Sequence, residues 1–533
     1  MGRLDRRPAR HRHRAGGRDG HGRRVGGGAR RRRAARRPRR PRRREALSVP
    51  VTNERFDLAA AVPAWEELGA VHLVAIGGAG MSAVARLLLQ RGVAVSGSDV
   101  ADSPVLEALR AAGATVWVGH DPAHVDGVDT VVVSSAIRED NPELAAARQR
   151  GLRVLHRSQA LAAVSAGARV VAVAGANGKT TTTSMLTAAL VHAGADPSFA
   201  SGGEIAQLGT NAALGSGEAF VVEADESDGS FVVYRPEVAV VTSVQPDHLD
   251  FYGTPEAVTE AYDVFAGTVR QGGLLVACHD DPGALALAQH HRAGGHRVLT
   301  YGEHADADVR VLAVEPAGLG TTARVRHGGR EVSLALRVPG LHNVLDAVGA
   351  LGAAVDGLGA DLDAVVEGLG DFTGARRRFE VRGEVDGVTV VDDYAHNPAK
   401  VAAVVSTAAG VVARAGRGRV LVVFQPHLYS RTRDFADAFA QALAPADHVV
   451  LLDVYGAREA PLPGVTSALV GDPLVELPGR RRVDVGVDAD RAVELLAAAA
   501  APGDLVLTVG AGDVTRLGAP LLEALRARAG ERA

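Results

Sequence analysis

The chain has 533 residues, enough for about three domains of ordinary size, which excludes a single small binding module. Its one cysteine, Cys278, cannot form a disulfide within the chain, so we expect a cytoplasmic protein. No uninterrupted apolar run reaches the roughly 20 residues that cross a bilayer, so we do not expect a membrane protein. The formal net charge of -3 hides an asymmetry: residues 1–44 hold 20 Arg and 2 Asp, which leaves 39 basic against 60 acidic residues in 45–533. This acidic body argues against nucleic-acid binding by the body.

The Arg-rich start, residues 1–46, is predicted to be a disordered tail, because it has too few apolar side chains to offset its chain entropy by burial. Such a tail can hold nucleic acid or anionic lipid electrostatically, or it can be an upstream extension without a role in the fold. Lysine is rare in the chain as a whole: Lys179 and Lys400 stand against 57 Arg. A retained lysine therefore indicates a chemical reason for that side chain.

Residues 66–165 are predicted to form the first α/β domain. An apolar strand from Val71 leads into the glycine turn GGAGMS, a helix over 83–90 and a second strand that ends at Asp99. Glycines at such a turn let the backbone approach a phosphate at the helix N-terminus, and Asp99 is placed to accept ribose hydroxyls. Taken alone, the pattern also fits an NAD dehydrogenase or a purely structural turn.

A second domain is predicted over 166–375, and it opens with a stronger signal. The strand RVVAVAG is followed by Ala176, Asn177, Gly178, Lys179 and Thr180, and then by a helix. A phosphate-binding loop needs glycine N–H groups around the polyphosphate, a lysine for its charge and a Thr hydroxyl for Mg²⁺. We therefore expect ATP and Mg²⁺ at this loop.

Two acidic segments follow strands of the same domain. Glu223 ends the strand AFVVE, where a nucleotide-bound Mg²⁺ finds a second protein ligand. The segment QPDHLD presents His248 between two carboxylates after the strand VAVVTSV. The residues of this segment fit a metal site and a solvated acidic loop about equally well.

The third domain is predicted over 376–533 and repeats the order strand, loop, helix. Polar side chains follow the carboxyl ends of its strands, where ligands bind in open parallel sheets. His396, His427 and Arg431 are expected to share one rim of this sheet and to face a substrate.

Together these motifs resemble the Mur ligases over about residues 70–525. The segments that carry the resemblance are GGAGMS, GANGKTTTTSM, VEADESDGSF, PDHLDFYG, PGLHN, RRRFE, DDYAHNP, FQPHLYSRTRDF and LDVYGAREAPLPG. The resemblance is to the branch that adds L-alanine to UDP-N-acetylmuramate, and it implies a three-domain α/β architecture: a Rossmann-like UDP-binding domain, a P-loop ATPase domain and a Rossmann-like C-terminal domain that binds the amino acid. It also implies ATP-dependent ligation through an acyl phosphate in peptidoglycan synthesis.

The resemblance implies roles for individual residues. The UDP-sugar is assigned to Gly78, Ala79, Gly80, Met81, Ser82, Asp99, Ser134 and Ser135. ATP is assigned to Gly175, Ala176, Asn177, Gly178, Lys179, Thr180, Thr181, Asn343 and Arg378. Metal ions are assigned to Thr180, Glu223 and His248, and the alanine rim to Tyr394, His396, His427 and Arg431. The residues expected to be catalytic are Lys179, Glu223, His248, His396 and Arg431.

Several positions depart from the family pattern: Ala75, Ala176, Asn177, Ser243, Gln245, Asp346, Asn397 and Lys400. Because they lie within motifs, two alternatives stay open: a divergent paralogue that binds UDP-sugar and nucleotide with little turnover, and a ligase for another amine or a peptide. The expected partners are UDP-N-acetylmuramate and L-alanine, and the expected oligomeric state is a monomer or a homodimer.

Overall fold

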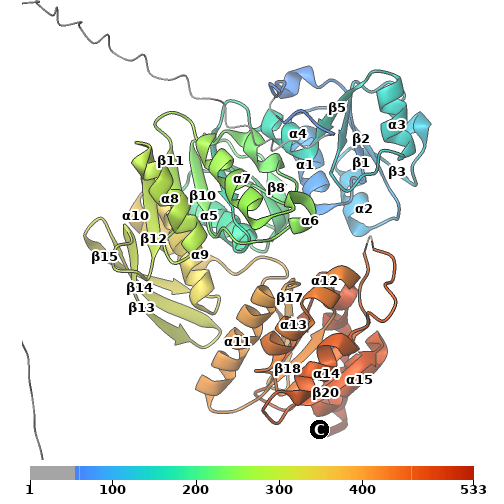
Figure 1. The fold of residues 1–533 in the computed structure, drawn as a ribbon, viewed down its shortest axis with the longest axis vertical. Coiled ribbons are helices and arrows are strands. Elements are labelled where there is room, and N and C mark those ends of the chain that lie inside the picture. Colours follow the sequence, from blue (N-terminus) through green and yellow to red (C-terminus); the bar gives the residue numbers. More distant parts are fainter. Residues whose placement is uncertain (1–54, 59, 458, 533) are drawn as a thin grey trace, which may run out of the picture. The chain divides into compact units, whose positions relative to one another are not determined.

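A computed structural model describes residues 55–58, 60–457 and 459–532. These residues form three separate sheets flanked by helices, which Figure 1 shows in blue, green to yellow, and orange to red. The α/β, three-domain prediction is confirmed. The tail predicted over 1–46 lies outside the described residues.

The first sheet is parallel, with the strand order β3-β2-β1-β4-β5. Its strands are β1 (Val71–Val74), β2 (Val95–Asp99), β3 (Thr115–Val118), β4 (Thr130–Val133) and β5 (Arg153–His156). Its helices are α1 (Ala79–Gln90), α2 (Pro104–Ala111), α3 (Pro142–Gln149) and α4 (Arg157–Val164), with short 3-10 turns η1 (Trp65–Glu67) and η2 (Pro122–Val125). The prediction that α1 begins at residue 83 is wrong, because Gly78 caps the helix and its carbonyl accepts the N–H of Ser82 at 2.8 Å.

The central sheet has the order β15-β14-β13-β12-β11-β10-β6-β9-β7-β8. Its strands are β6 (Arg169–Ala174), β7 (Ser198–Ile205), β8 (Thr210–Ala213), β9 (Ala219–Glu223), β10 (Val238–Val241), β11 (Leu274–Cys278), β12 (Arg297–Gly302), β13 (Val309–Ala317), β14 (Gly320–His327) and β15 (Arg330–Leu336). Its helices are α5 (Lys179–His192), α6 (Leu249–Tyr252), α7 (Pro255–Gly267), α8 (Pro282–Ala293), α9 (Leu341–Gly352) and α10 (Leu362–Asp371), with η3 (Ser230–Tyr234) and the π-helical turn η4 (Ala353–Gly357). Antiparallel pairing is confined to the two ends of this sheet, so β6 and β9, which carry the predicted nucleotide ligands, lie in its parallel middle.

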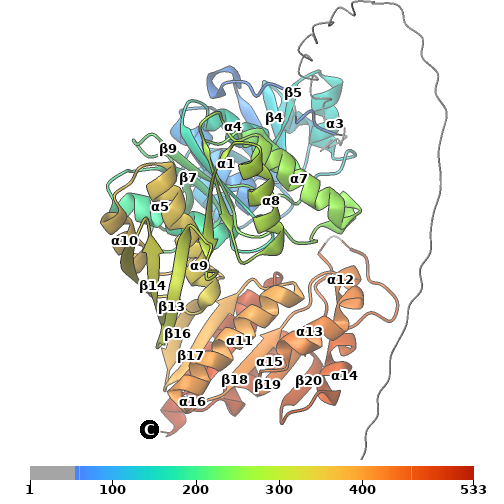
Figure 2. The same cartoon turned by 60° about the vertical axis from the view of Figure 1, so that its left-hand side comes forward.

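The third sheet has the order β16-β17-β21-β18-β19-β20 and is parallel except for its first pair. Its strands are β16 (Glu380–Val385), β17 (Val388–Asp393), β18 (Val420–Phe424), β19 (His448–Leu452), β20 (Arg482–Val487) and β21 (Leu505–Val509). Its helices are α11 (Pro398–Ala415), α12 (Tyr429–Asp434), α13 (Ala436–Leu443), α14 (Ala468–Glu476), α15 (Ala489–Ala499) and α16 (Gly518–Arg532), with η5 (Asp513–Leu517). The alternation of inward side chains along each strand builds one core against α11, α13 and α14 and another against α15 and α16 (Figure 2).

A repeated local signal sets where helices begin. A capping Ser, Asn, Thr or Asp precedes a proline at the first helical position of α2, α3, α7, α8 and α11. The cap side chain accepts a free N–H of the first turn, and proline loses nothing there because its missing N–H would have no partner. The start of α11 matters most below, because Asn397 and Pro398 fix the position of the residues that follow.

Helix α11 is the one helix in the described ranges that is long and apolar enough to meet the criterion for a membrane span. Its Val401, Val404, Val405 and Ala408 are buried in the core of the third sheet. These four apolar side chains attach the helix to the sheet of the third domain.

Candidate functional site

The loop between β6 and α5 is shaped by two glycines in conformations that other residues rarely adopt. Gly175 has φ 144° and Gly178 has φ 81°. A Cβ atom at Gly175 would lie 1.9 Å from Oγ1 of Thr242, and one at Gly178 would lie 2.3 Å from Oδ1 of Asp346. The loop therefore needs glycine at both positions, for its backbone and for the space around it.

Lys179 stands at the N-terminus of α5, largely enclosed. Its Nζ donates to the carbonyl of Gly175 at 2.7 Å and lies 2.8 Å from the carboxylate of Glu226. Burial opposes the charged form of Lys179, but the negative charges of Glu226, Asp225 and Glu223 outweigh it and raise the pKa of the lysine. Lys179 is therefore held as a cation at a helix N-terminus, the arrangement that binds phosphate.

The predicted magnesium ligands Thr180 and Glu223 lie side by side. Oγ1 of Thr180 donates to Oε1 of Glu223 at 3.0 Å, and a guanidinium nitrogen of Arg378 donates to the same hydroxyl at 3.3 Å. The other oxygen of Glu223 accepts the N–H of Gly202 at 2.7 Å. A hydroxyl and a carboxylate beside a phosphate loop fit Mg²⁺, which takes oxygen ligands and completes its shell with water and phosphate.

His248, the third predicted metal ligand, lies near two carboxylates. Its Nε2 is 3.8 Å from Glu226 and 3.9 Å from Asp247. Within the described ranges no group of three or more His, Cys, Asp or Glu side chains is arranged to hold a metal ion. The role of His248 stays a prediction.

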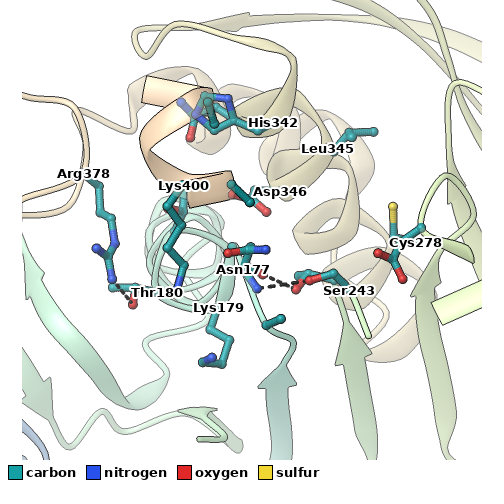
Figure 3. Close-up of a pocket in the computed structure, with 18 of the residues that line it drawn as sticks. Asn177, Lys179, Thr180, Ser243, Cys278, His342, Leu345, Asp346, Arg378 and Lys400 are labelled. Carbon is teal, nitrogen blue, oxygen red and sulfur yellow. Dashed lines mark hydrogen bonds between the residues drawn. The ribbon is translucent and has the colours of Figure 1, made fainter. Parts of the chain in front are cut away.

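The loop opens into a cavity of about 490 Å³ that is lined from both the central and the third sheet (Figure 3). It brings together Ala176, Asn177, Gly178, Lys179, Thr180, Thr181, Glu223, Asn343 and Arg378 from the predicted set. It also includes Asp393 and Lys400 from the third domain. The predicted nucleotide-binding residues other than Gly175 therefore line one cavity, which is large enough for a small-molecule ligand.

Asp346 also lines this cavity and lies on α9, three residues after Asn343. Its Oδ1 accepts a hydrogen bond from Oγ1 of Thr182 at 3.1 Å, and its side chain is buried against Gly178. Burial raises the pKa of Asp346 to about 8, an effect that Thr182 and Arg378 only partly offset. Asp346 is therefore mainly protonated at neutral pH.

Three departures from the family pattern contact one another. The N–H of Asn177 donates to Oγ of Ser243 at 3.1 Å, and its side-chain amide donates to Oε1 of Gln245 at 3.2 Å. Gln245 in turn donates to Asp281 at 3.0 Å, and Asp281 also accepts the N–H of Val244. These residues form a continuous network along the cavity wall, and the amide of Gln245 is engaged by Asn177 and Asp281.

Three of the side chains predicted for the third-domain rim lie close to one another. The rings of His396 and His427 lie 6.0 Å apart between centroids, and the ring of Tyr394 lies 5.1 Å from that of His396. Burial lowers the pKa of His396 well below its usual value, and the charges of Lys400 and Arg431 add to the effect. His396 is therefore neutral at pH 7, and its Nδ1 lies 2.8 Å from the carbonyl of Tyr394.

In the first domain, the carboxylate of Asp99 holds the glycine turn by accepting the N–H of Gly77 at 2.9 Å. Of the other predicted UDP-binding residues, Gly78 caps α1, Ala79, Gly80, Met81 and Ser82 form its first turn, and Ser134 follows β4. The hydroxyl of Ser135 donates to Asp228 of the central domain at 2.7 Å.

Asp228 belongs to a buried polar network that the sequence did not predict. It lies 3.1 Å from His156, and its neighbour Asp225 lies 2.5 Å from Arg157 at the start of α4. Burial opposes the charge of Asp225, but Arg157 and Lys179 lower its pKa to about 2. The acidic run EADESD is the one sequence signal for this network. Its partners His156 and Arg157 could not be predicted from it, because they lie about 70 positions away in the sequence.

Comparison with known proteins matches all three domains. Family models described as "Mur ligase family, catalytic domain", "Mur ligase middle domain" and "Mur ligase, glutamate ligase domain" match residues 70–169, 173–354 and 377–512. The chain is 57% identical to the UDP-N-acetylmuramate–L-alanine ligase of Kineococcus radiotolerans, over 88% of this chain and 99% of that protein. It is 54% identical to the ligase of that name from Paenarthrobacter aurescens, over 86% and 98%.

Solved structures agree with the sequence relatives. The crystal structure of UDP-N-acetylmuramate–alanine ligase MurC from Thermotoga maritima aligns with a TM-score of 0.73 and 28% identity, over 86% of this chain and 99% of that one. The murein peptide ligase of Psychrobacter arcticus aligns with a TM-score of 0.63 and 25% identity, over 86% and 98%.

Proposed function

The chain belongs to the Mur ligase family, and we propose that it joins L-alanine to UDP-N-acetylmuramate in an ATP-dependent, ADP-forming step of peptidoglycan precursor synthesis. The observation that carries this proposal is the identity to alanine ligases, which runs through all three domains. The phosphate loop and the third-domain rim support it with the groups that such a ligation needs. The reaction takes place in the cytoplasm, where ATP is available.

The reaction has two steps. The lactyl carboxylate of UDP-N-acetylmuramate attacks the γ-phosphorus of ATP, which forms an acyl phosphate and releases ADP. The amine of L-alanine then attacks the acyl carbon, and the tetrahedral intermediate collapses to an amide and inorganic phosphate. The first step brings a carboxylate against a polyphosphate, and two such anions at close range repel strongly unless their charge is neutralised.

Residues of the central domain meet this demand. Lys179 is held as a cation by Glu226 and directs its charge, with the N-terminus of α5, at the polyphosphate. Thr180 and Glu223 would hold one Mg²⁺ and His248 a second, and bound Mg²⁺ would neutralise phosphate charge. Asn343 lies on the cavity wall, and its proposed role is to contact the adenine.

Residues of the third domain receive the amino acid. Because Nδ1 of His396 donates to the carbonyl of Tyr394, the lone pair of this neutral ring is on Nε2. Nε2 then accepts a hydrogen bond from the amine of L-alanine, and Arg431 faces its carboxylate. Gly78–Ser82, Asp99, Ser134 and Ser135 hold the UDP portion in the first domain.

One assay separates this function from its alternatives. Release of ADP and phosphate is measured with the full chain, Mg²⁺ and ATP, with UDP-N-acetylmuramate and L-alanine added singly and together. Release that requires both substrates is the expected result. A paralogue without turnover would release neither product, and a ligase for another amine would respond to glycine, L-serine or a peptide more strongly than to L-alanine.

A further inference from the structure

Lys179 and Lys400 line the same cavity. They are the two lysines of the sequence and lie 221 positions apart. Lys179 begins α5 in the central domain, and Lys400 lies in the first turn of α11 in the third domain. Figure 3 shows the side chain of Lys400 extending from its helix toward Lys179 and Thr180. The chain has 57 Arg and only these two Lys. The presence of both lysines at one cavity therefore points to a shared ligand.

The backbone at Lys400 is fixed, but its ammonium group is not engaged. Oδ1 of Asn397 accepts the N–H of Lys400 at 2.9 Å, and Pro398 sets the first helical residue. Among the described residues, Nζ of Lys400 has no hydrogen-bond or ion-pair partner, whereas Nζ of Lys179 has Gly175 and Glu226. The helix start thus holds an unpaired cation over the phosphate loop.

The surrounding positive charges make the charged form of Lys400 unfavourable unless an anion is bound. Burial, together with repulsion from Lys179 and Arg378, lowers the pKa of Lys400 to about 8, and the carboxylates of Asp247 and Glu226 offset this only in part. Three cations therefore face one partly enclosed cavity. A polyphosphate placed among them would relieve their mutual repulsion.

We propose that Lys400 contacts the polyphosphate of the bound nucleotide, as a positioning residue that links the third domain to ATP held on the central domain. This inference rests on the proposed function, since it takes ATP as the polyphosphate. Lys179 and Arg378 approach the nucleotide from the loop and the linker that precedes β16, and Lys400 approaches from α11. Bound ATP thereby orders the third-domain rim over the reacting groups.

Direct binding tests the inference without turnover. The dissociation constants of ADP and adenosine are measured by calorimetry for the full chain and for Lys400→Gln. We expect Lys400→Gln to weaken ADP about tenfold, the scale of one charge-assisted hydrogen bond, and to leave adenosine unchanged. Lys400→Arg keeps the charge and should retain most of the ADP affinity.

Two further variants make the outcome decisive. Arg414→Gln removes one positive charge from the exposed far end of α11 and should leave ADP binding unchanged. Wild-type ADP affinity in Lys400→Gln, or an equal loss of adenosine affinity, would overturn the inference. If Lys179→Ala alone loses ADP, the phosphate loop and the proposed function stand while the role of Lys400 fails; if Lys179→Ala also binds ADP normally, both fail.

Discussion

The chain uses the same local design twice, and the two copies differ in what surrounds them. β1 leads through residues 75–78 into α1, and β6 leads through 175–178 into α5. In the first turn, the N–H of Gly77 donates a hydrogen bond to Asp99, and the capping residue Gly78 has an ordinary φ of -62°. The second turn has glycines at φ 144° and 81° and is followed at once by Lys179.

This difference shows that a strand, glycine turn and helix provide only a backbone cradle. The second turn becomes a site for a polyphosphate because a lysine, a threonine and the carboxylate of Glu223 are packed against it. The two turns also differ in the space around their glycines. The backbone of Gly178 lies against Asp346, whereas Gly78 has room beside it for a Cβ atom. Substitutions at matched positions of the two turns should therefore have different effects.

The largest effect is expected for Lys179→Ala. Removing the ammonium group leaves the polyphosphate without its main cation, and we expect ligase turnover to fall about a thousandfold or more. The fold should survive, because burial already raises the pKa of Glu226, which can take up a proton when its partner is lost. Steady-state ADP release and a melting curve check this, and near-normal turnover would contradict the phosphate-loop assignment.

The matched pair Gly178→Ala and Gly78→Ala tests the contrast directly. A Cβ at Gly178 would lie 2.3 Å from Asp346 in a backbone of positive φ, so we expect a loss of about 2–3 kcal/mol in unfolding free energy. A Cβ at Gly78 would meet its nearest neighbour, the carbonyl of Ala75, at 3.5 Å, so we expect about 0.5 kcal/mol or less. Equal losses in urea denaturation would show that the turns are constrained alike.

Much of the site was predictable because its signals are local. The sequence GANGKT, the strand-end carboxylate Glu223 and the strand-end residues His396 and His427 follow from apolar runs and their punctuation. In a parallel sheet, side chains at the carboxyl ends of strands gather at one edge, so their proximity follows from the fold class.

Contacts between distant segments were not predictable. The hydrogen bond from Asn177 to Gln245 and the ion pair of Arg157 with Asp225 join positions more than 60 residues apart. Their geometry depends on how helices and loops pack, and no periodicity in the sequence encodes it. For this reason Asn177 and Gln245 looked like independent departures, whereas they are partners in one network.

Asp346→Asn should stabilise the protein in a pH-dependent way. Burial raises the pKa of Asp346 from 3.8 to about 8, so the folded state keeps a proton that the unfolded state loses. Stability contributed by this group is fully present below pH 3.8 and is lost as pH rises through 8. Asn removes the titration and can still accept the hydrogen bond from Thr182, so we expect a gain of roughly 4 kcal/mol at pH 7.

Urea denaturation at several pH values measures this effect. The advantage of Asp346→Asn over the wild type should be small near pH 4, grow between pH 4 and 8, and stay level above pH 8. A constant difference across this range would show that Asp346 titrates near its usual value, and that its carboxylate is ionised beside Gly178.

The smallest effect is expected for Ala75→Gly in the first turn. Ala75 has φ 57°, a left-handed conformation that costs an L-residue about 1–2 kcal/mol and costs glycine little. Glycine loses roughly 0.5–1 kcal/mol through its greater freedom in the unfolded chain, so the net gain should be about 0.5 kcal/mol, seen as a slightly higher melting temperature. Ala114→Gly is the control: it makes the same change beside β3 at a residue without positive φ, and should lower the melting temperature. If Ala75→Gly also lowers the melting temperature, packing around Ala75 outweighs its backbone strain. The first turn would then differ from the second, because it would not require glycine at its left-handed position.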